Sequence, residues 1–84
     1  MRILVIALLI TLATNLSAGQ QIAEAQRLLN ALSYSAGSVD GVYGSKTERA
    51  IVQFYKDNGK VFDGKLGENE LDALKEEMQQ ALKG

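Results

Sequence analysis

Apolar residues recur along this chain at spacings of three and four positions, the pattern typical of amphipathic helices. Three stretches show it, and they predict helices at Gln21–Leu32, at Ser45–Asp57 and from Glu68 toward the C-terminus. None of the chain shows the sustained alternation of apolar and polar residues that is typical of a strand. We therefore predict an all-α fold in which three helices bury their apolar stripes against one another. The expected inward positions are Ile22, Ala25, Leu28, Leu29 and Leu32; Thr47, Ala50, Ile51 and Phe54; and Leu71, Leu74, Met78 and Leu82.

The second predicted helix carries signals at both ends. Ser45 and Glu48 have the spacing of a capping box, in which serine accepts an amide hydrogen and glutamate reaches back. Asn58 and Gly59 predict its end, because glycine tolerates the left-handed conformation of a helix stop. Since the chain has no proline, glycine, asparagine, aspartate and serine must supply all of its turns.

Two segments between the predicted helices have similar sequences. Val39–Gly44 reads Val-Asp-Gly-Val-Tyr-Gly, and 23 residues later Phe62–Gly67 reads Phe-Asp-Gly-Lys-Leu-Gly. Aspartate can accept backbone N–H bonds from the residues just after it, and the next glycine adopts positive φ without steric cost. Each segment leads into a predicted helix, so the sequence predicts one turn-to-helix unit, Asp-Gly-x-x-Gly, used twice. The predicted fold is thus a compact three-helix bundle with two copies of this unit.

The first 19 residues have the layout of a secretory signal peptide. A short positive start precedes an apolar run at residues 3–12, and small residues follow at 17–19. A helix of about ten residues spans only roughly 15 Å, about half of a bilayer core. We predict cleavage after Ala18 or Gly19, which leaves one domain at residues 20–84 in a secreted or periplasmic protein with no stable membrane span. An uncleaved anchor is the alternative.

Composition limits the chemistry that is open to this chain. Histidine and cysteine are absent, which excludes serine–histidine and cysteine–histidine nucleophiles and the usual zinc ligands. Asp40 and Asp63 lack the further carboxylates of a calcium loop, so we expect no metal and no cofactor. A net charge of −1 gives no drive toward nucleic acid. The acidic residues after position 67 form no glycosidase pair, because three short helices offer no deep cleft. We predict no enzyme.

Several segments together resemble a known family. They read Gln-Arg-Leu-Leu-Asn-Ala-Leu at 26–32, Val-Asp-Gly-Val-Tyr-Gly-Ser-Lys-Thr at 39–47, Ala-Ile-Val-Gln-Phe at 50–54, Asp-Asn-Gly at 57–59 and Asp-Gly-Lys-Leu-Gly at 63–67. In this order they are similar to the peptidoglycan-binding domain of bacterial cell-wall hydrolases. The resemblance implies a three-helix module that binds the cell wall and usually tethers a catalytic domain. The predicted export signal agrees, because the wall lies outside the cytoplasmic membrane.

The chain also departs from the family pattern. Ser33 stands where the family commonly has glycine, Ser45 and Glu68 where it commonly has proline, and Tyr55 where glutamine is usual. The largest departure is the missing enzyme, because the chain has room for the module alone.

Five residues are candidates for contact with the wall polymer, whose hydroxyls, amides and sugar faces suit aromatic rings and a few polar groups. Tyr34 and Tyr43 could offer rings, Asp40 and Gln53 could hydrogen-bond, and Arg49 could meet a peptide carboxylate. Structural roles remain open for three of them. Tyr43 could plug the bundle, Asp40 could serve its turn alone, and Arg49 could be a solvated helix residue.

The leading hypothesis is an exported, monomeric, non-catalytic module that binds peptidoglycan. The alternative is a protein-interaction or regulatory module of the same fold that acts on a separate exported cell-wall hydrolase. An exposed apolar patch that includes Tyr55 or Phe62 would favour the alternative.

Overall fold

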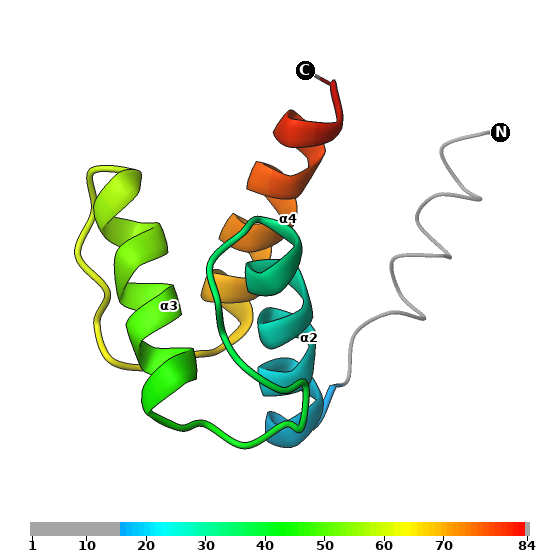
Figure 1. Cartoon of the computed structure of the whole chain (residues 1–84). Helices are drawn as coiled ribbons and strands as arrows, with labels where there is room; N and C mark the ends of the chain where they lie inside the picture. The colour runs from blue at the N-terminus through cyan, green and yellow to red at the C-terminus, as the bar shows by residue number, and fades with distance from the viewer. Residues whose placement is uncertain (1–15, 84) are drawn as a thin grey trace, which may run out of the picture.

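The computed structural model describes residues 16–83. This part of the chain forms three helices and no strand, which confirms the predicted all-α fold: α2 at Ala18–Ala31, α3 at Ser45–Asp57 and α4 at Glu68–Lys83. α2 packs against both α3 and α4 (Figure 1). Most of the predicted signal peptide, residues 1–15, lies outside the described residues.

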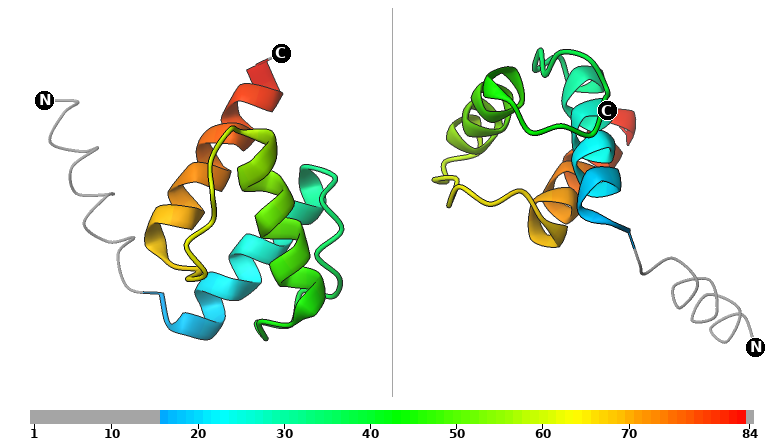
Figure 2. Two further views of the ribbon diagram at one scale, coloured as in Figure 1. Left: turned by 90° about the vertical axis from the view of Figure 1, so that its left-hand side faces the viewer. Right: turned by 90° about the horizontal axis from the view of Figure 1, so that it is seen from below.

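Long loops return the chain to the same end of the molecule after each helix. Residues 32–44 run back along α2, and residues 58–67 run back along α3 (Figures 1 and 2). The three helices therefore point in broadly the same direction. The last turn of α4 extends past the other two helices (Figure 1). Leu82 lies in that turn and is 79% exposed, so its predicted burial is wrong because no neighbouring element reaches it.

The core lies where the three helices meet. Leu29, Ile51 and Leu74 contribute one fully buried side chain from each helix, as the apolar pattern predicts. Ala36 joins them from the loop after α2. Other predicted inward residues are half-buried at the margin of this core: Ile22, Leu28, Leu32 and Met78. The buried apolar set is Ala25, Leu29, Ala36, Ala50, Ile51, Phe54, Leu71 and Leu74.

Helix α2 begins at Ala18, three residues before the predicted start at Gln21. Ser17 and Gln20 form a complete capping box at this start. The Gln20 amide donates to Ser17 Oγ at 3.2 Å, and the Ser17 amide donates to Gln20 Oε1 at 2.9 Å. The predicted start is wrong because residues 17–19 were assigned to the leader. Cleavage after Ala18 or Gly19 would remove the Ser17 cap.

The predicted capping box at the start of α3 is wrong. Gly44 is the N-cap, with an extended backbone at φ −125° and no side-chain cap bond. Ser45 is already the first helical residue, so its hydroxyl stands one position too late to accept the amide of the third residue. The predicted end is confirmed, because Asn58 is the C-cap and Gly59 adopts φ +72°.

Ser33 is the only residue other than glycine with a left-handed backbone among residues 16–83, at φ +74°. It follows Leu32, the C-cap of α2, and turns the chain away from the helix. A residue with a Cβ loses about 1–2 kcal/mol in this conformation relative to glycine. We therefore expect Ser33→Gly to raise the free energy of unfolding by about 1 kcal/mol, measured by urea denaturation. Ser35→Gly, which replaces a serine with negative φ, is the control, and a lower midpoint for Ser33→Gly would contradict the assignment.

A row of four aromatic rings ties both loops to the end of α3. Tyr34 packs edge-on against Phe54 with centroids 5.7 Å apart, Phe54 against Tyr55 at 5.6 Å, and Tyr55 against Phe62 at 5.7 Å. Such pairs add about 0.5–1.5 kcal/mol each beyond the area that they bury. Tyr55 and Phe62 are half-buried in this row, so they do not form the exposed patch that would favour the alternative hypothesis.

The two Asp-Gly turns have the local geometry that their sequences predict. In each turn the aspartate Oδ1 accepts the amide two residues later, at 3.0 Å for Asp40 and 2.9 Å for Asp63. Gly41 has φ +74° and Gly64 has φ +92°. The first turn is also bound by a side chain from α2, that of Gln26.

Gln26 is a buried hydrogen-bonding centre, with only 1% of its surface exposed. Its Oε1 accepts the amides of Asp40 and Gly41, both at 3.0 Å. The two hydrogens of its Nε2 are shared among three acceptors: Asp40 Oδ1 at 3.1 Å, the Val42 carbonyl at 3.0 Å and Thr47 Oγ1 at 2.9 Å. One side chain thus fixes the first Asp-Gly turn to α2 and to the start of α3.

Candidate functional site

Three of the five predicted contact residues line one hollow. Tyr34, Arg49 and Gln53 surround a space of about 270 Å³ between the loop after α2 and one face of α3. Arg49 and Gln53 lie four residues apart, so they share a face of the helix. We name this hollow the Tyr34 groove. Its lining residues are Ser33, Tyr34, Ser35, Arg49, Ala50 and Gln53.

Asp57, the last residue of α3, holds two of the groove residues in place. The Tyr34 hydroxyl donates to Asp57 Oδ2 at 2.8 Å, and Gln53 Nε2 donates to Asp57 Oδ1 at 2.7 Å. Both carboxylate oxygens are therefore engaged, one by the loop and one by the helix. Hydrogen bonds to an ionised carboxylate are among the stronger ones in proteins. Tyr34 is fixed further by its edge-on contact with Phe54.

These bonds shift the pKa values of Tyr34 and Asp57 in the directions that favour hydrogen bonding between them. The hydrogen bond to Asp57, then burial, raises the pKa of Tyr34 from 10.0 to about 12. The hydrogen bonds from Tyr34 and Gln53 lower the pKa of Asp57 below 3.8. A raised tyrosine pKa adds stability below pH 10, and a lowered aspartate pKa adds stability above pH 3.8. Between those two pH values, both groups therefore keep the protonation states that the Tyr34–Asp57 bond requires.

Arg49 supplies the cationic group of the groove. Its side chain is exposed on α3. The ion pair found among residues 16–83 joins Arg27 to Glu24 on α2, so the Arg49 guanidinium has no carboxylate partner in that part of the chain. A guanidinium presents N–H donors in a planar fork that matches a carboxylate.

Asp40 lies outside the Tyr34 groove. It borders a second hollow of about 340 Å³, together with Gln26 and the first residues of α3. Its Oδ1 accepts from the Val42 amide and from Gln26 Nε2. These bonds, the Val42 bond first, lower the pKa of Asp40. The arrangement gives Asp40 the structural role that its turn requires, and the structure does not bring it together with Tyr34.

Tyr43 also lies outside the groove. Its ring is half-buried, and its hydroxyl is buried without a hydrogen-bond partner among the described residues. Burial, followed by the charge of Glu48, raises the pKa of Tyr43. A half-buried ring is what the structural role proposed for Tyr43, filling space in the bundle, requires.

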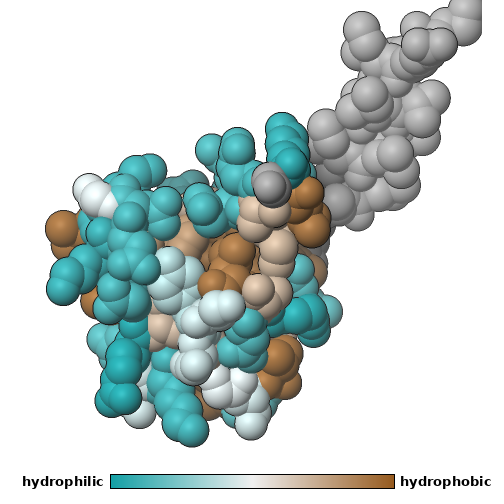
Figure 3. Space-filling model, turned by 45° about the horizontal axis from the view of Figure 1, so that its top comes forward, coloured by the Kyte–Doolittle hydropathy of each residue, from teal (hydrophilic) through white to brown (hydrophobic). Residues whose placement is uncertain are grey.

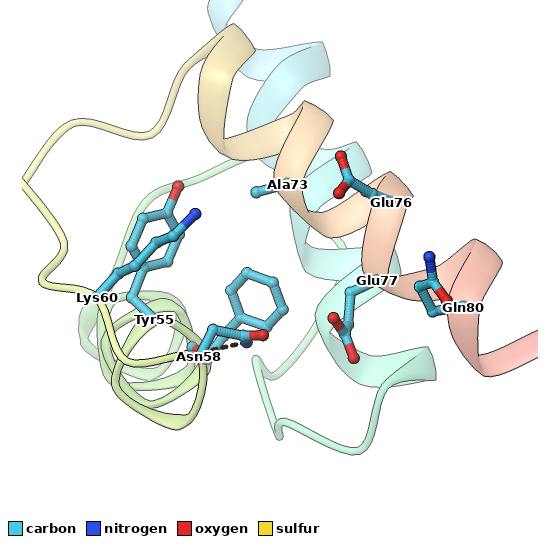
Figure 4. Close-up of a pocket in the computed structure, with 8 residues that line it drawn as sticks. Tyr55, Asn58, Lys60, Ala73, Glu76, Glu77 and Gln80 are labelled. Atoms are coloured by element: carbon cyan, nitrogen blue, oxygen red, sulfur yellow. Dashed lines mark hydrogen bonds between the residues drawn. The ribbon is translucent and has the colours of Figure 1, made fainter.

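A third hollow, of about 130 Å³, lies between the end of α3 and α4 (Figure 4). Tyr55, Asn58 and Lys60 line one side of it, and residues of α4 line the other. The α4 residues are Ala73, Glu76, Glu77 and Gln80. Asn58 Nδ2 donates to the Phe54 carbonyl at 2.8 Å (Figure 4). None of the five predicted contact residues lines this hollow.

Several large apolar side chains are exposed among the described residues. Figure 3 shows a mainly hydrophilic face with an apolar area that runs from its centre toward the upper right. In the described part of the chain, no helix is long and apolar enough to cross a membrane. Within the same residues, no group of three carboxylates could hold a metal ion. The exposed large apolar residues are Leu16, Val39, Val42, Val52, Val61 and Leu82.

Comparison with known proteins identifies the family of the chain. Residues 18–74 match the model of the family described as "Putative peptidoglycan binding domain". The chain belongs to this family. The match begins at the first residue of α2 and spans both loops, α3 and the Tyr34 groove. A peptidoglycan-binding domain of this kind is a binding domain and is not catalytic by itself. No solved structure matches the chain.

Two residues that organise this peptidoglycan-binding domain are missing from the predicted site. Asp57 was interpreted as the end of a helix, although its spacing of four residues from Gln53 allows a side-chain hydrogen bond. Gln26 is not among the inward positions that the apolar pattern predicts for the first helix. Its burial depends on the loop that folds over it, and no local sequence signal shows that contact.

Proposed function

We propose that this chain is an exported, non-catalytic module that binds bacterial peptidoglycan through the Tyr34 groove. The observation that carries the proposal is the family match over residues 18–74. The groove supports it because Tyr34, Arg49 and Gln53 offer an aromatic ring, a guanidinium and an amide in one hollow. A polymer of sugars and short peptides presents the hydroxyls, amides and carboxylates that such groups bind.

We propose further that residues 1–19 are a leader and residues 20–84 the mature domain, secreted or periplasmic. The support is the positive start, the apolar run and the small residues that follow it. A wall-binding module must also leave the cytoplasm to meet its ligand. On this proposal, the first turn of α2 exists in full only before cleavage.

We also propose that the two Asp-Gly units are copies of one ancestral turn. Their equivalent positions are 23 residues apart. Matching backbone bonds support the proposal: the Glu48 amide donates to the Gly44 carbonyl at 2.9 Å, and the Leu71 amide donates to the Gly67 carbonyl at 3.0 Å.

Sedimentation with insoluble sacculi tests the binding function directly. The purified protein is mixed with sacculi at low and at moderate salt, and the bound fraction is measured after centrifugation. We expect the protein to sediment with the sacculi at both salt concentrations. Protein that stays in the supernatant at both would refute the proposed function. Cellulose of matched mass serves as the control for adsorption to an insoluble polymer.

Arg49→Ala should weaken sacculus binding about tenfold, because a hydrogen bond to a charged group contributes about 1.5–3 kcal/mol. The side chain is exposed and lies on the outer face of α3, so the thermal midpoint should stay near that of the parent. Arg27→Ala is the matched control, since it removes an exposed arginine from α2. If Arg27→Ala weakens binding as much as Arg49→Ala, the effect belongs to net charge and not to the groove.

A further inference from the structure

The hydrogen bonds to Asp57 determine which atoms of the groove remain available to a ligand. An ionised carboxylate can only accept hydrogen bonds. The Tyr34 hydroxyl therefore directs its hydrogen at Asp57 Oδ2, and the Gln53 amide must turn its Nε2 toward Asp57 Oδ1. Tyr34 Oη is then left with its lone pairs, which can only accept. Gln53 is left with the acceptor Oε1 and with the second hydrogen of Nε2.

Arg49 lies one helical turn before Gln53 and gives the groove a group of the opposite character. A guanidinium has N–H donors and no acceptor, and Arg49 has no carboxylate partner within residues 16–83. A complementary ligand therefore presents an N–H or O–H donor to Tyr34 and Gln53, and an anionic acceptor to Arg49. Sugar hydroxyls both donate and accept, so they do not need this fixed division. The last residue of a peptide does need it, because its amide N–H is a donor and its free carboxylate is an anionic acceptor.

We propose that Asp57 fixes the hydrogen-bond polarity of the Tyr34 groove, and that the groove binds the carboxyl end of a short peptide. The terminal carboxylate pairs with Arg49, and the N–H of the last peptide bond donates to Tyr34 Oη or Gln53 Oε1. This inference rests on the proposed function and specifies it, since the peptides of the wall polymer become the ligand. The volume of about 270 Å³ is near the lower end of small-molecule pockets, which suits one or two residues.

The test compares two probes that differ in one N–H group. N-acetyl-alanyl-alanine carries the peptide N–H, and N-acetyl-alanyl-lactate has an ester oxygen in its place with nearly the same shape. Each probe is prepared with L and, separately, with D stereocentres. It is titrated into the purified, isotope-labelled protein while the amide chemical shifts of the protein are followed by NMR. We expect the amide probe to bind about tenfold more tightly than the ester and to shift resonances of residues 33–35 and 49–53. The C-terminal carboxamide of the same dipeptide should bind at least tenfold more weakly.

The ratio of the two affinities isolates the role of Asp57 as a positioning residue. Asp57→Asn should bring the amide-to-ester ratio close to one, because the amide side chain of this variant can donate as well as accept. A merely loosened fold would weaken both probes and leave the ratio unchanged. Asp57→Glu should restore part of the ratio, and Asp72→Asn, an exposed aspartate on α4, should leave it at the parent value. In a Tyr34→Phe background, Asp57→Asn should lower the ratio by a smaller factor.

Several results would overturn the inference. Equal affinity for amide and ester in the parent protein is one, and an unchanged ratio in Asp57→Asn is another. A third is a trimer of N-acetylglucosamine that shifts the groove resonances while the dipeptide does not, which would assign the groove to the glycan. Sacculus sedimentation separates the two proposals: sedimentation without dipeptide binding refutes this inference alone. Dipeptide binding without sedimentation refutes the proposed wall-binding function alone.

Discussion

Replacing Gln26 with leucine should unfold most of the protein at 37 °C. Leucine has a similar volume and suits the buried site, but it leaves the amides of Asp40 and Gly41 and the Thr47 hydroxyl without their partner. A buried polar group left unpaired costs about 1–3 kcal/mol. The Thr47 bond is buried and the two amide bonds are part-buried, so the expected loss is about 3 kcal/mol. The core of a domain this small contributes only about 3–5 kcal/mol net. Thermal and urea denaturation followed by circular dichroism measure the loss.

Two further variants show whether hydrogen bonding causes the effect. Gln79→Leu makes the same change at an exposed position of α4 and should leave the midpoint within a few degrees of the parent. Gln26→Glu keeps acceptors for the two amides but places a second carboxylate beside Asp40 Oδ1, which now accepts from Gln26 at 3.1 Å. We expect it to be destabilised at pH 7 and partly recovered as the pH falls and the carboxylate is protonated. A leucine variant that melts like the parent would show that Gln26 only fills space.

The bounds of a helix could be predicted from the sequence where its apolar pattern or capping residues lie within the helix itself or directly beside it. The apolar stripe and the Asn58-Gly59 stop predict α3 at its observed bounds, and Glu68 predicts the start of α4. The start of α2 was misplaced because residues 17–19 carry two overlapping signals. They satisfy the small-residue pattern of a leader, and Ser17 with Gln20 also satisfies a capping box. The Ser-x-x-Gln spacing can be read from the sequence, and the structure shows that it is used.

The sequence predicted which residue types could form the candidate site, but only partly which of those residues lie together in the structure. Tyr34, Arg49 and Gln53 meet in one hollow because the loop after α2 runs beside α3. The same fold keeps Asp40 and Tyr43 out of that hollow, although their residue types suit a binding role equally well. Whether any of the five contacts peptidoglycan stays a prediction. Gln26 hydrogen-bonds to Asp40, 14 residues away in sequence, and Asp57 hydrogen-bonds to Tyr34, 23 residues away. Helical periodicity and turn rules describe only neighbouring residues, so they do not predict these contacts.

Gly41→Ala should destabilise the protein much more than Gly64→Ala, although both glycines occupy the same place in the repeated motif. Both have positive φ, so an added Cβ costs about 1–2 kcal/mol at either position. At Gly41 the new Cβ would also lie 2.9 Å from the backbone oxygen of Gly19, whereas at Gly64 nothing lies within 4 Å. Overpacking against backbone adds about 1–3 kcal/mol. The expected loss is about 3 kcal/mol for Gly41→Ala and about 1 kcal/mol for Gly64→Ala, measured by urea denaturation.

Gly44→Ala is the matched control, because Gly44 has negative φ and open space around its Cα, and it should be close to neutral. The origin of the difference can be tested by changing where the chain begins. In a chain that starts at Leu16, Gly19 is present and the larger cost of Gly41→Ala should appear in full. In a chain that starts at Gln20, the opposing carbonyl is gone and the two alanine variants should differ by less than about 1 kcal/mol, since only the backbone strain remains. An equal loss at Gly41 and Gly64 in the longer chain would place the first turn away from α2. The Gln26 bonds to that turn would then be wrong as well.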